Sequence, residues 1–117
     1  MAWDAAAIVA RWPNLSTHTN VPSSAELALI ATANISTFLV DVGSAYSATD
    51  ATHLELLAWL ALREVILWYQ NQMDYSESMA NNAGSGSLPT LRECNFQIKH
   101  YTTLAKGTQK KFNFRSG

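Results

Sequence analysis

The feature that most limits how this chain can fold is residues 56–69, which are apolar almost without a break. The apolar side chains fall at nearly every angle around a helix, and only Arg63 and Glu64 are charged. A helix that is apolar all round must be surrounded by other elements, and this run is shorter than the ~20 residues that span a membrane. We therefore expect a buried helix over residues 49–72, either central in the fold or facing the core on one side and a neighbouring subunit on the other. A polar loop, 71–87, follows it.

Two further helices are predicted in the N-terminal half of the chain. The first spans residues 4–11 and must stop before Pro13, because the residue preceding a proline is pushed out of the helical region. The second begins at a capping box formed by Ser23 and Glu26. Its apolar residues recur at three- and four-residue spacing and form one stripe, which Gly43 ends.

A fourth helix is predicted near the C-terminus. Pro89 suits its first position, and its apolar residues again form a stripe until Lys106 and Gly107 end the helix. Aromatic and polar residues then alternate, which is typical of an extended segment. The sequence thus predicts an all-α fold. One domain, a small helical bundle of about four helices over residues 1–106, is followed by an extended basic C-terminal tail over residues 107–117.

The chain is nearly neutral, but its charges are unevenly distributed. Its 117 residues, 15% of them charged, have a formal net charge of −1. Residues 1–91 carry a net charge of −6, whereas residues 92–117 carry +5. An acidic body joined to a basic tail indicates two different partners.

The sequence shows no readable active site, metal site or cofactor site. The histidines (His18, His53, His100) and Cys94 lie far apart, without the spacing of metal ligands or of a catalytic nucleophile and its base. Cys94 falls on an apolar stripe and is interpreted as a small core residue; as the only cysteine it excludes an intrachain disulfide. His53 is interpreted as part of a capping turn. We therefore expect no cofactor and no enzymatic activity.

Two charged features remain with alternative interpretations. Arg63 and Glu64 form either a pair satisfied within the fold or an ion pair between subunits. The basic C-terminal segment is either a solvated terminus or a binding element, for a protein partner or for nucleic acid through phosphate contacts and stacking. The predicted partner-binding residues are Lys106, Lys110, Lys111, Phe112, Phe114 and Arg115.

The order of elements resembles that of the head–tail connector (adaptor, or neck) proteins of tailed bacteriophages. The resemblance is carried by a short helix ending in Arg11-Trp12-Pro13, a capped helix with Ser-Ala-Glu-Leu-Ala-Leu-Ile-Ala-Thr-Ala at residues 24–33, an apolar helix, the segment Tyr-Ser-Glu-Ser-Met at residues 75–79, a polar loop, a fourth helix and a basic tail. It covers most of the chain and rests on element order.

This resemblance implies a structural virion protein at the head–tail junction, made in the host cytoplasm. Such proteins form a homo-oligomeric ring, commonly a dodecamer, that docks on the portal protein, extends the DNA channel and receives the next tail or neck protein. DNA passes through the lumen without specific binding, and no membrane is involved. The C-terminal segment, residues 107–117 here, is expected to reach the portal. The alternative is a small helical nucleic-acid-binding or regulatory protein with a basic C-terminal tail.

Overall fold

The computed structural model describes residues 2–13, 15, 22–71 and 89–116, with side chains placed for all of these except 69–71 and 108–116. This part of the chain forms four helices and no strand: α1 (Ala5–Arg11), α2 (Ser24–Val42), α3 (Ala51–Asn71) and α5 (Leu91–Ser116). The predicted all-α bundle of four helices is confirmed. The loop expected after the central helix lies almost wholly in residues 72–88, outside the described residues.

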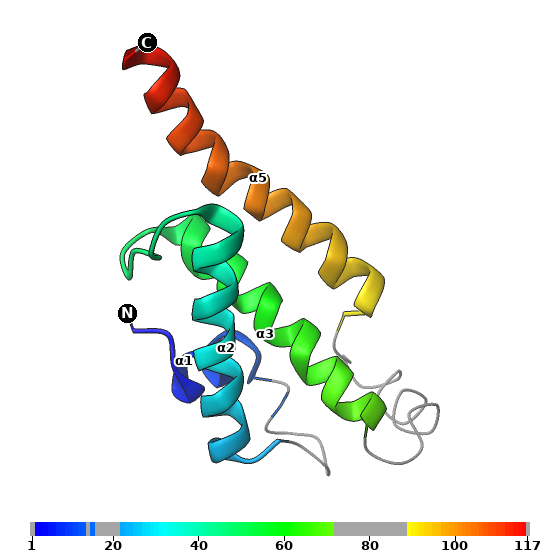
Figure 1. The fold of residues 1–117 in the computed structure, drawn as a ribbon. Helices are drawn as coiled ribbons and strands as arrows, with labels where there is room; N and C mark the ends of the chain where they lie inside the picture. Colours follow the sequence, from blue (N-terminus) through cyan, green and yellow to red (C-terminus); the bar gives the residue numbers. More distant parts are fainter. Residues whose placement is uncertain (1, 14, 16–21, 72–88, 117) are drawn as a thin grey trace.

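Helix α3 is the centre of the bundle, as residues 56–69 predicted. Helix α5 runs antiparallel along one side of α3, α2 packs on another side, and α1 packs against α2 and touches α3 (Figure 1). Every residue from Leu56 to Leu62 is buried. Seven consecutive buried residues span all directions around a helix, so neighbours cover α3 on every side along this stretch.

The neighbouring helices each bury one stripe against this centre. The stripe of α2 includes Leu27, Phe38 and Val42, and that of α5 includes Cys94 and Ile98. Because these stripes face the core, the opposite sides of α2 and α5 face outward, away from the bundle.

The predicted capping box starts α2. The Ser23 hydroxyl accepts the Glu26 backbone N–H at 3.1 Å, and the Glu26 carboxylate accepts the Ser23 backbone N–H at 2.8 Å. The Trp68 indole on α3 also donates to Glu26, at 2.9 Å. These hydrogen bonds hold the pKa of the Glu26 carboxyl below its usual value, and the bond from the Ser23 backbone N–H has the largest effect. Gly43, with φ at 93°, ends the helix in a left-handed conformation that favours glycine.

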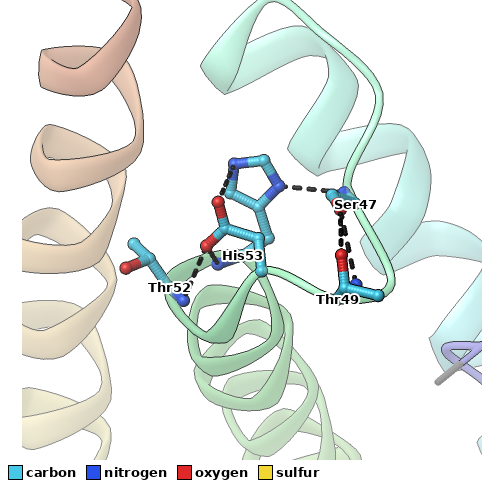
Figure 2. Close-up of polar contacts among 5 residues, drawn as sticks. Ser47, Thr49, Thr52 and His53 are labelled. Atoms are coloured by element: carbon cyan, nitrogen blue, oxygen red, sulfur yellow. Dashed lines mark hydrogen bonds and ion pairs between the residues drawn. The ribbon is translucent and has the colours of Figure 1, made fainter.

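The turn between α2 and α3 is closed by side chains of its own residues (Figure 2). The Asp50 carboxylate accepts the backbone N–H groups of Thr52 at 2.9 Å and His53 at 3.2 Å, so Asp50 caps α3. His53 Nδ1 accepts the Ser47 backbone N–H at 2.9 Å, and the ring packs edge-on against Phe38. The interpretation of His53 as a capping-turn residue is therefore confirmed.

The end of α5 differs from the prediction. The helix does not stop at Lys106 and Gly107 but continues through Gly107 to Ser116, so residues 107–116 are helical and not extended. A glycine inside a helix costs only about 1 kcal/mol relative to alanine, and the lysines and glutamine that follow are good helix formers. The glycine is therefore too weak a signal to end the helix.

The continued helix lengthens the molecule. A rise of about 1.5 Å per residue gives α5 a length of about 39 Å. Figure 1 shows its C-terminal end extending past the ends of α2 and α3. The principal dimensions are 53 × 25 × 21 Å, and the radius of gyration is 15.3 Å, against about 13 Å for a compact chain of this length.

Helix α2 is more apolar than its place in the bundle requires. By length and composition alone it could cross a membrane, with a mean hydropathy of 1.5 over Ser24–Val42, but such a test is also met by core helices of soluble proteins. Only 28% of that window is buried inside the bundle. Apolar residues are therefore also present on its outward side.

Candidate interaction surfaces

The predicted partner-binding residues all lie on the C-terminal part of α5. Lys106 is exposed. Lys110, Lys111, Phe112, Phe114 and Arg115 lie within the helical backbone, and their side chains are outside the described part. Their role in binding a partner stays a prediction.

The helical backbone changes one aspect of that prediction. In an extended segment, positions 112 and 114 share a side, whereas two residues two apart in a helix do not face the same way. Position 112 follows Ala105 by seven residues, about two turns, so it falls on the face of α5 that packs against α3. The two phenylalanine positions therefore cannot both meet one flat partner surface.

The outward side of α2 has no charged residue. We call it the outer face of α2, and its members are exposed: Ala25, Ala28, Leu29, Thr32, Ala33, Ser36, Leu39 and Val40. Leu29 is 72% exposed, Leu39 51% and Val40 80%. Sequence analysis missed this surface because it followed the stripe that became buried. The missed signal is a second run, at positions 25, 29, 32, 36 and 39.

A second outward surface lies on α5. We call it the outer face of α5, and it consists of Arg92, Phe96, Lys99, His100, Thr103 and Leu104. Phe96 is 63% exposed and Leu104 44%. All five exposed large hydrophobic side chains of the described part thus belong to the outer faces of α2 and α5. Apolar residues that gather on two helix faces point to protein contacts more strongly than single scattered ones.

A hollow of about 220 Å³ lies between α1 and α3. Its lining is mostly apolar and comprises Trp3, Ala7, Ala10, Arg11, Leu54 and Glu55. Arg11 and Glu55 form a two-pronged ion pair across it, with Nε···Oε1 at 2.7 Å and Nη2···Oε2 at 3.1 Å. These hydrogen bonds raise the pKa of the Arg11 guanidinium and lower that of the Glu55 carboxyl. The pair links α1 to α3. Because the guanidinium and the carboxylate are already paired with each other, neither is an unpaired charge that a ligand could bind.

Arg63 and Glu64 approach each other only loosely. Arg63 Nε lies 4.0 Å from Glu64 Oε2, and both side chains are half-buried. This geometry agrees with a contact within the fold. An additional contact of either side chain with a neighbouring subunit stays a prediction.

The reactive residue types do not converge in the described part of the chain. Burial raises the pKa of the Cys94 thiol to about 11, so the thiolate is scarce at neutral pH and Cys94 is a core residue, as predicted. His100 is exposed and packs against Tyr101, and His18 lies outside the described residues. No group of three or more His, Cys, Asp or Glu side chains that could hold a metal ion occurs among the residues described.

In the described part of the chain, the exposed large hydrophobic side chains thus gather on two outward helix faces, and the reactive residue types do not. Comparison of the chain with protein-family models, with curated proteins and with solved structures finds no match.

Proposed function

We propose that this chain is a structural subunit of a bacteriophage head–tail junction. In this proposal its copies form an oligomeric ring that docks on the portal, extends the DNA channel and receives the next neck or tail protein. The proposal takes its specific setting from the family resemblance of the sequence. From the structure it draws on one observation above all, the end of α5 that projects from the bundle.

The projecting end is poorly suited to remain uncovered. Residues 107–116 continue α5 past the ends of α2 and α3. Most of the stability of a protein helix comes from the packing of one face against other elements, and α2 and α3 end before this part of α5 (Figure 1). A partner that packs beyond the end of α3, on the same face of α5, would stabilise this end. Position 112 lies on that face.

The charge distribution is compatible with this role. The projecting residues 108–116 carry a net charge of +3, whereas residues 1–107, which include the part of α5 that packs in the bundle, carry −4. An acidic channel wall would repel passing DNA, so the DNA would not stick to it. A basic projection would extend away from that wall and bind a protein partner. Its lysines would mainly raise the association rate and fix orientation.

Deletion of residues 108–117 tests the proposal. We expect the truncated protein to keep the helical signal of the remaining residues and the melting temperature, because the bundle core lies elsewhere. Binding to immobilised portal rings should be lost. Normal docking of the truncated protein would refute the assignment. Loss of only a salt-sensitive DNA affinity, in parallel fluorescence-anisotropy titrations, would favour the nucleic-acid-binding alternative, since phosphate contacts weaken steeply with salt.

A matched pair of substitutions sharpens this test. Burial of one phenylalanine contributes about 1.5–3 kcal/mol, so Phe112→Ala should weaken portal binding about 10- to 100-fold. Phe114→Ala removes the same group from a different face and should have a much smaller effect. Equal effects of the two substitutions would show that the partner does not meet α5 on the face that packs against α3.

A further inference from the structure

Helix α5 carries a second stripe of residues that does not pack in the bundle. Positions 92, 96, 99, 103 and 106 are spaced 4-3-4-3, so they share one side of the helix, away from the buried Cys94 and Ile98. This side overlaps the outer face of α5 but leaves out His100 and Leu104. We call it the basic stripe of α5, and its members are all exposed: Arg92, Asn95, Phe96, Lys99, Thr103 and Lys106.

The cations of the basic stripe form an unpaired line. Arg92, Lys99 and Lys106 follow one another at intervals of seven residues, about 10.5 Å along the helix axis. None of the three forms an ion pair within the described part of the chain. The only acidic residue of α5, Glu93, lies outside the stripe and accepts a hydrogen bond from Gln97 at 2.7 Å. The line of positive charge is therefore not neutralised along its length, and it fits a partner with a row of negative charges.

The other members of the stripe have the groups that suit a nucleic-acid strand. Phosphate oxygens accept hydrogen bonds from Asn and Thr side chains as well as from Arg and Lys, and Asn95 and Thr103 lie between the cations. Phe96 lies between Arg92 and Lys99 along the helix and is 63% exposed. An exposed aromatic ring beside phosphate-binding cations can stack on a base. Because each base in a duplex is already stacked on its neighbours, such a ring favours a single strand.

We propose that the basic stripe of α5 binds single-stranded nucleic acid. In this contact Arg92, Lys99 and Lys106 bind phosphates, and Phe96 stacks on one base. An anionic membrane surface fits less well, because a membrane-binding helix inserts several apolar side chains and Phe96 is the single apolar member of the stripe. Stacking and phosphate contacts tolerate any base sequence. The inference does not rest on the proposed function.

The number of cations predicts the strength and the salt dependence of the contact. We expect a dissociation constant of about 10⁻⁴–10⁻⁶ M at physiological salt, the range for binding without sequence preference. Three phosphate contacts give a slope of about −2 for the logarithm of the affinity against that of the salt concentration, at about −0.7 per contact for a single strand. The affinity should therefore fall about 20-fold between 50 and 200 mM salt.

Fluorescence anisotropy on the full chain tests the roles of the cations and of the ring. The probes are a labelled mixed-sequence oligonucleotide and its duplex. Lys99→Gln should reduce the magnitude of the salt slope by about 0.7 for the single strand. Phe96→Ala should weaken single-strand binding about 5- to 100-fold, the loss of one stacked base. The same substitution should leave duplex binding nearly unchanged, because the duplex offers no free base to the ring.

A matched pair of variants separates the stripe from the net charge of the chain. Thr103→Glu places a carboxylate within the basic stripe, and Ser36→Glu places one on α2, outside it. Both sites are exposed positions inside a helix, so neither change should alter the melting temperature. Thr103→Glu should weaken single-strand binding at least about tenfold, because it replaces a phosphate contact by repulsion of phosphate. Ser36→Glu should bind like the wild type.

Several results would overturn the proposal. No binding of the single strand at low salt, equal losses in Thr103→Glu and Ser36→Glu, or an unchanged single-strand affinity in Phe96→Ala each contradicts it. Binding to anionic phosphatidylserine vesicles that Thr103→Glu abolishes, with no binding of the oligonucleotide, indicates a membrane surface instead. Loss of all nucleic-acid binding on deletion of residues 108–117, with no effect of Thr103→Glu, assigns the affinity to the projecting end of α5. These measurements contain no portal, so their failure leaves the proposed docking to be decided by binding to portal rings.

Discussion

The hydrogen bond between Trp3 and Asn34 is the buried polar contact whose energy can be predicted most directly. Asn34 is 2% exposed and is the one buried polar side chain in the described part of the chain. Its Oδ1 accepts the Trp3 indole Nε1–H at 3.2 Å, and this bond joins the N-terminal segment to α2. Loss of either partner leaves the other polar group buried without a hydrogen bond.

A double-mutant cycle isolates this energy. Asn34→Leu keeps a side chain of similar size but leaves the indole N–H without its acceptor, and Trp3→Phe leaves the Asn34 carbonyl without its donor. Each unsatisfied group costs about 1–3 kcal/mol, whereas replacement of both partners by apolar groups is nearly neutral in this respect. We therefore expect the double variant to lose at least about 1 kcal/mol less stability than the sum of the single losses.

Urea unfolding followed by far-UV circular dichroism measures all four proteins without reliance on tryptophan fluorescence. The lost packing of the smaller phenylalanine ring occurs in both the single and the double variant and cancels in the cycle. Additivity within about 0.3–0.5 kcal/mol, the value for independent sites, would show that the Trp3–Asn34 bond contributes nothing and would refute the reasoning.

Three further predictions concern the core and the ion pair. Leu57→Ala, at a fully buried site on α3, should lose about 2–5 kcal/mol in urea unfolding; a loss below about 1 kcal/mol would contradict the central position of α3. Trp12→Phe should cost about 1 kcal/mol more than Trp59→Phe, because the Trp12 indole donates to a backbone carbonyl at 2.9 Å and the buried Trp59 indole has no partner in the described part. The reverse order in the same unfolding assay would be inconsistent with this geometry. The lowered pKa of Glu55 stabilises the fold above the pKa of the unfolded chain, and this stabilisation is lost as pH falls through the folded pKa. Glu55→Gln should therefore lower the free energy of unfolding by under about 1 kcal/mol near neutral pH, since the ion pair with Arg11 is partly exposed. The difference in stability between the variant and the wild type should vanish in acid. A difference that grows in acid would contradict this prediction.

The features that the sequence predicted are those with local physical causes. Ser23 and Glu26 lie three residues apart, and their reciprocal hydrogen bonds form within one helical turn. Gly43 ends α2 because its left-handed conformation favours glycine. The burial of α3 follows from the absence of any polar face between Leu56 and Leu62.

The features that the sequence did not predict depend on distant contacts or on small energy differences. Arg11 and Glu55 are 44 residues apart, and no local pattern pairs them. Gly107 resembles a helix end because glycine often follows one, but a glycine inside a helix costs only about 1 kcal/mol relative to alanine, and α5 continues through it. The sequence does not single out the outer face of α2, because the run at positions 25, 29, 32, 36 and 39 has the same period as the buried stripe and includes the polar Thr32 and Ser36. Only the fold shows which of the two faces is covered.

The uncharged outward side of α2 accounts for part of the low charge content of the chain. Charged residues make up 15% of the sequence, against about 25% in an average soluble domain. The deficit is pronounced on α2, where 19 residues carry two charges and neither belongs to the outward side. A helix whose outward side only contacts water usually carries charged residues on that side. An uncharged outward side instead lowers the cost of removing water from it, because no charge has to be desolvated. The same residues that make α2 resemble a membrane helix in composition therefore make it a surface suited to packing against a second helix.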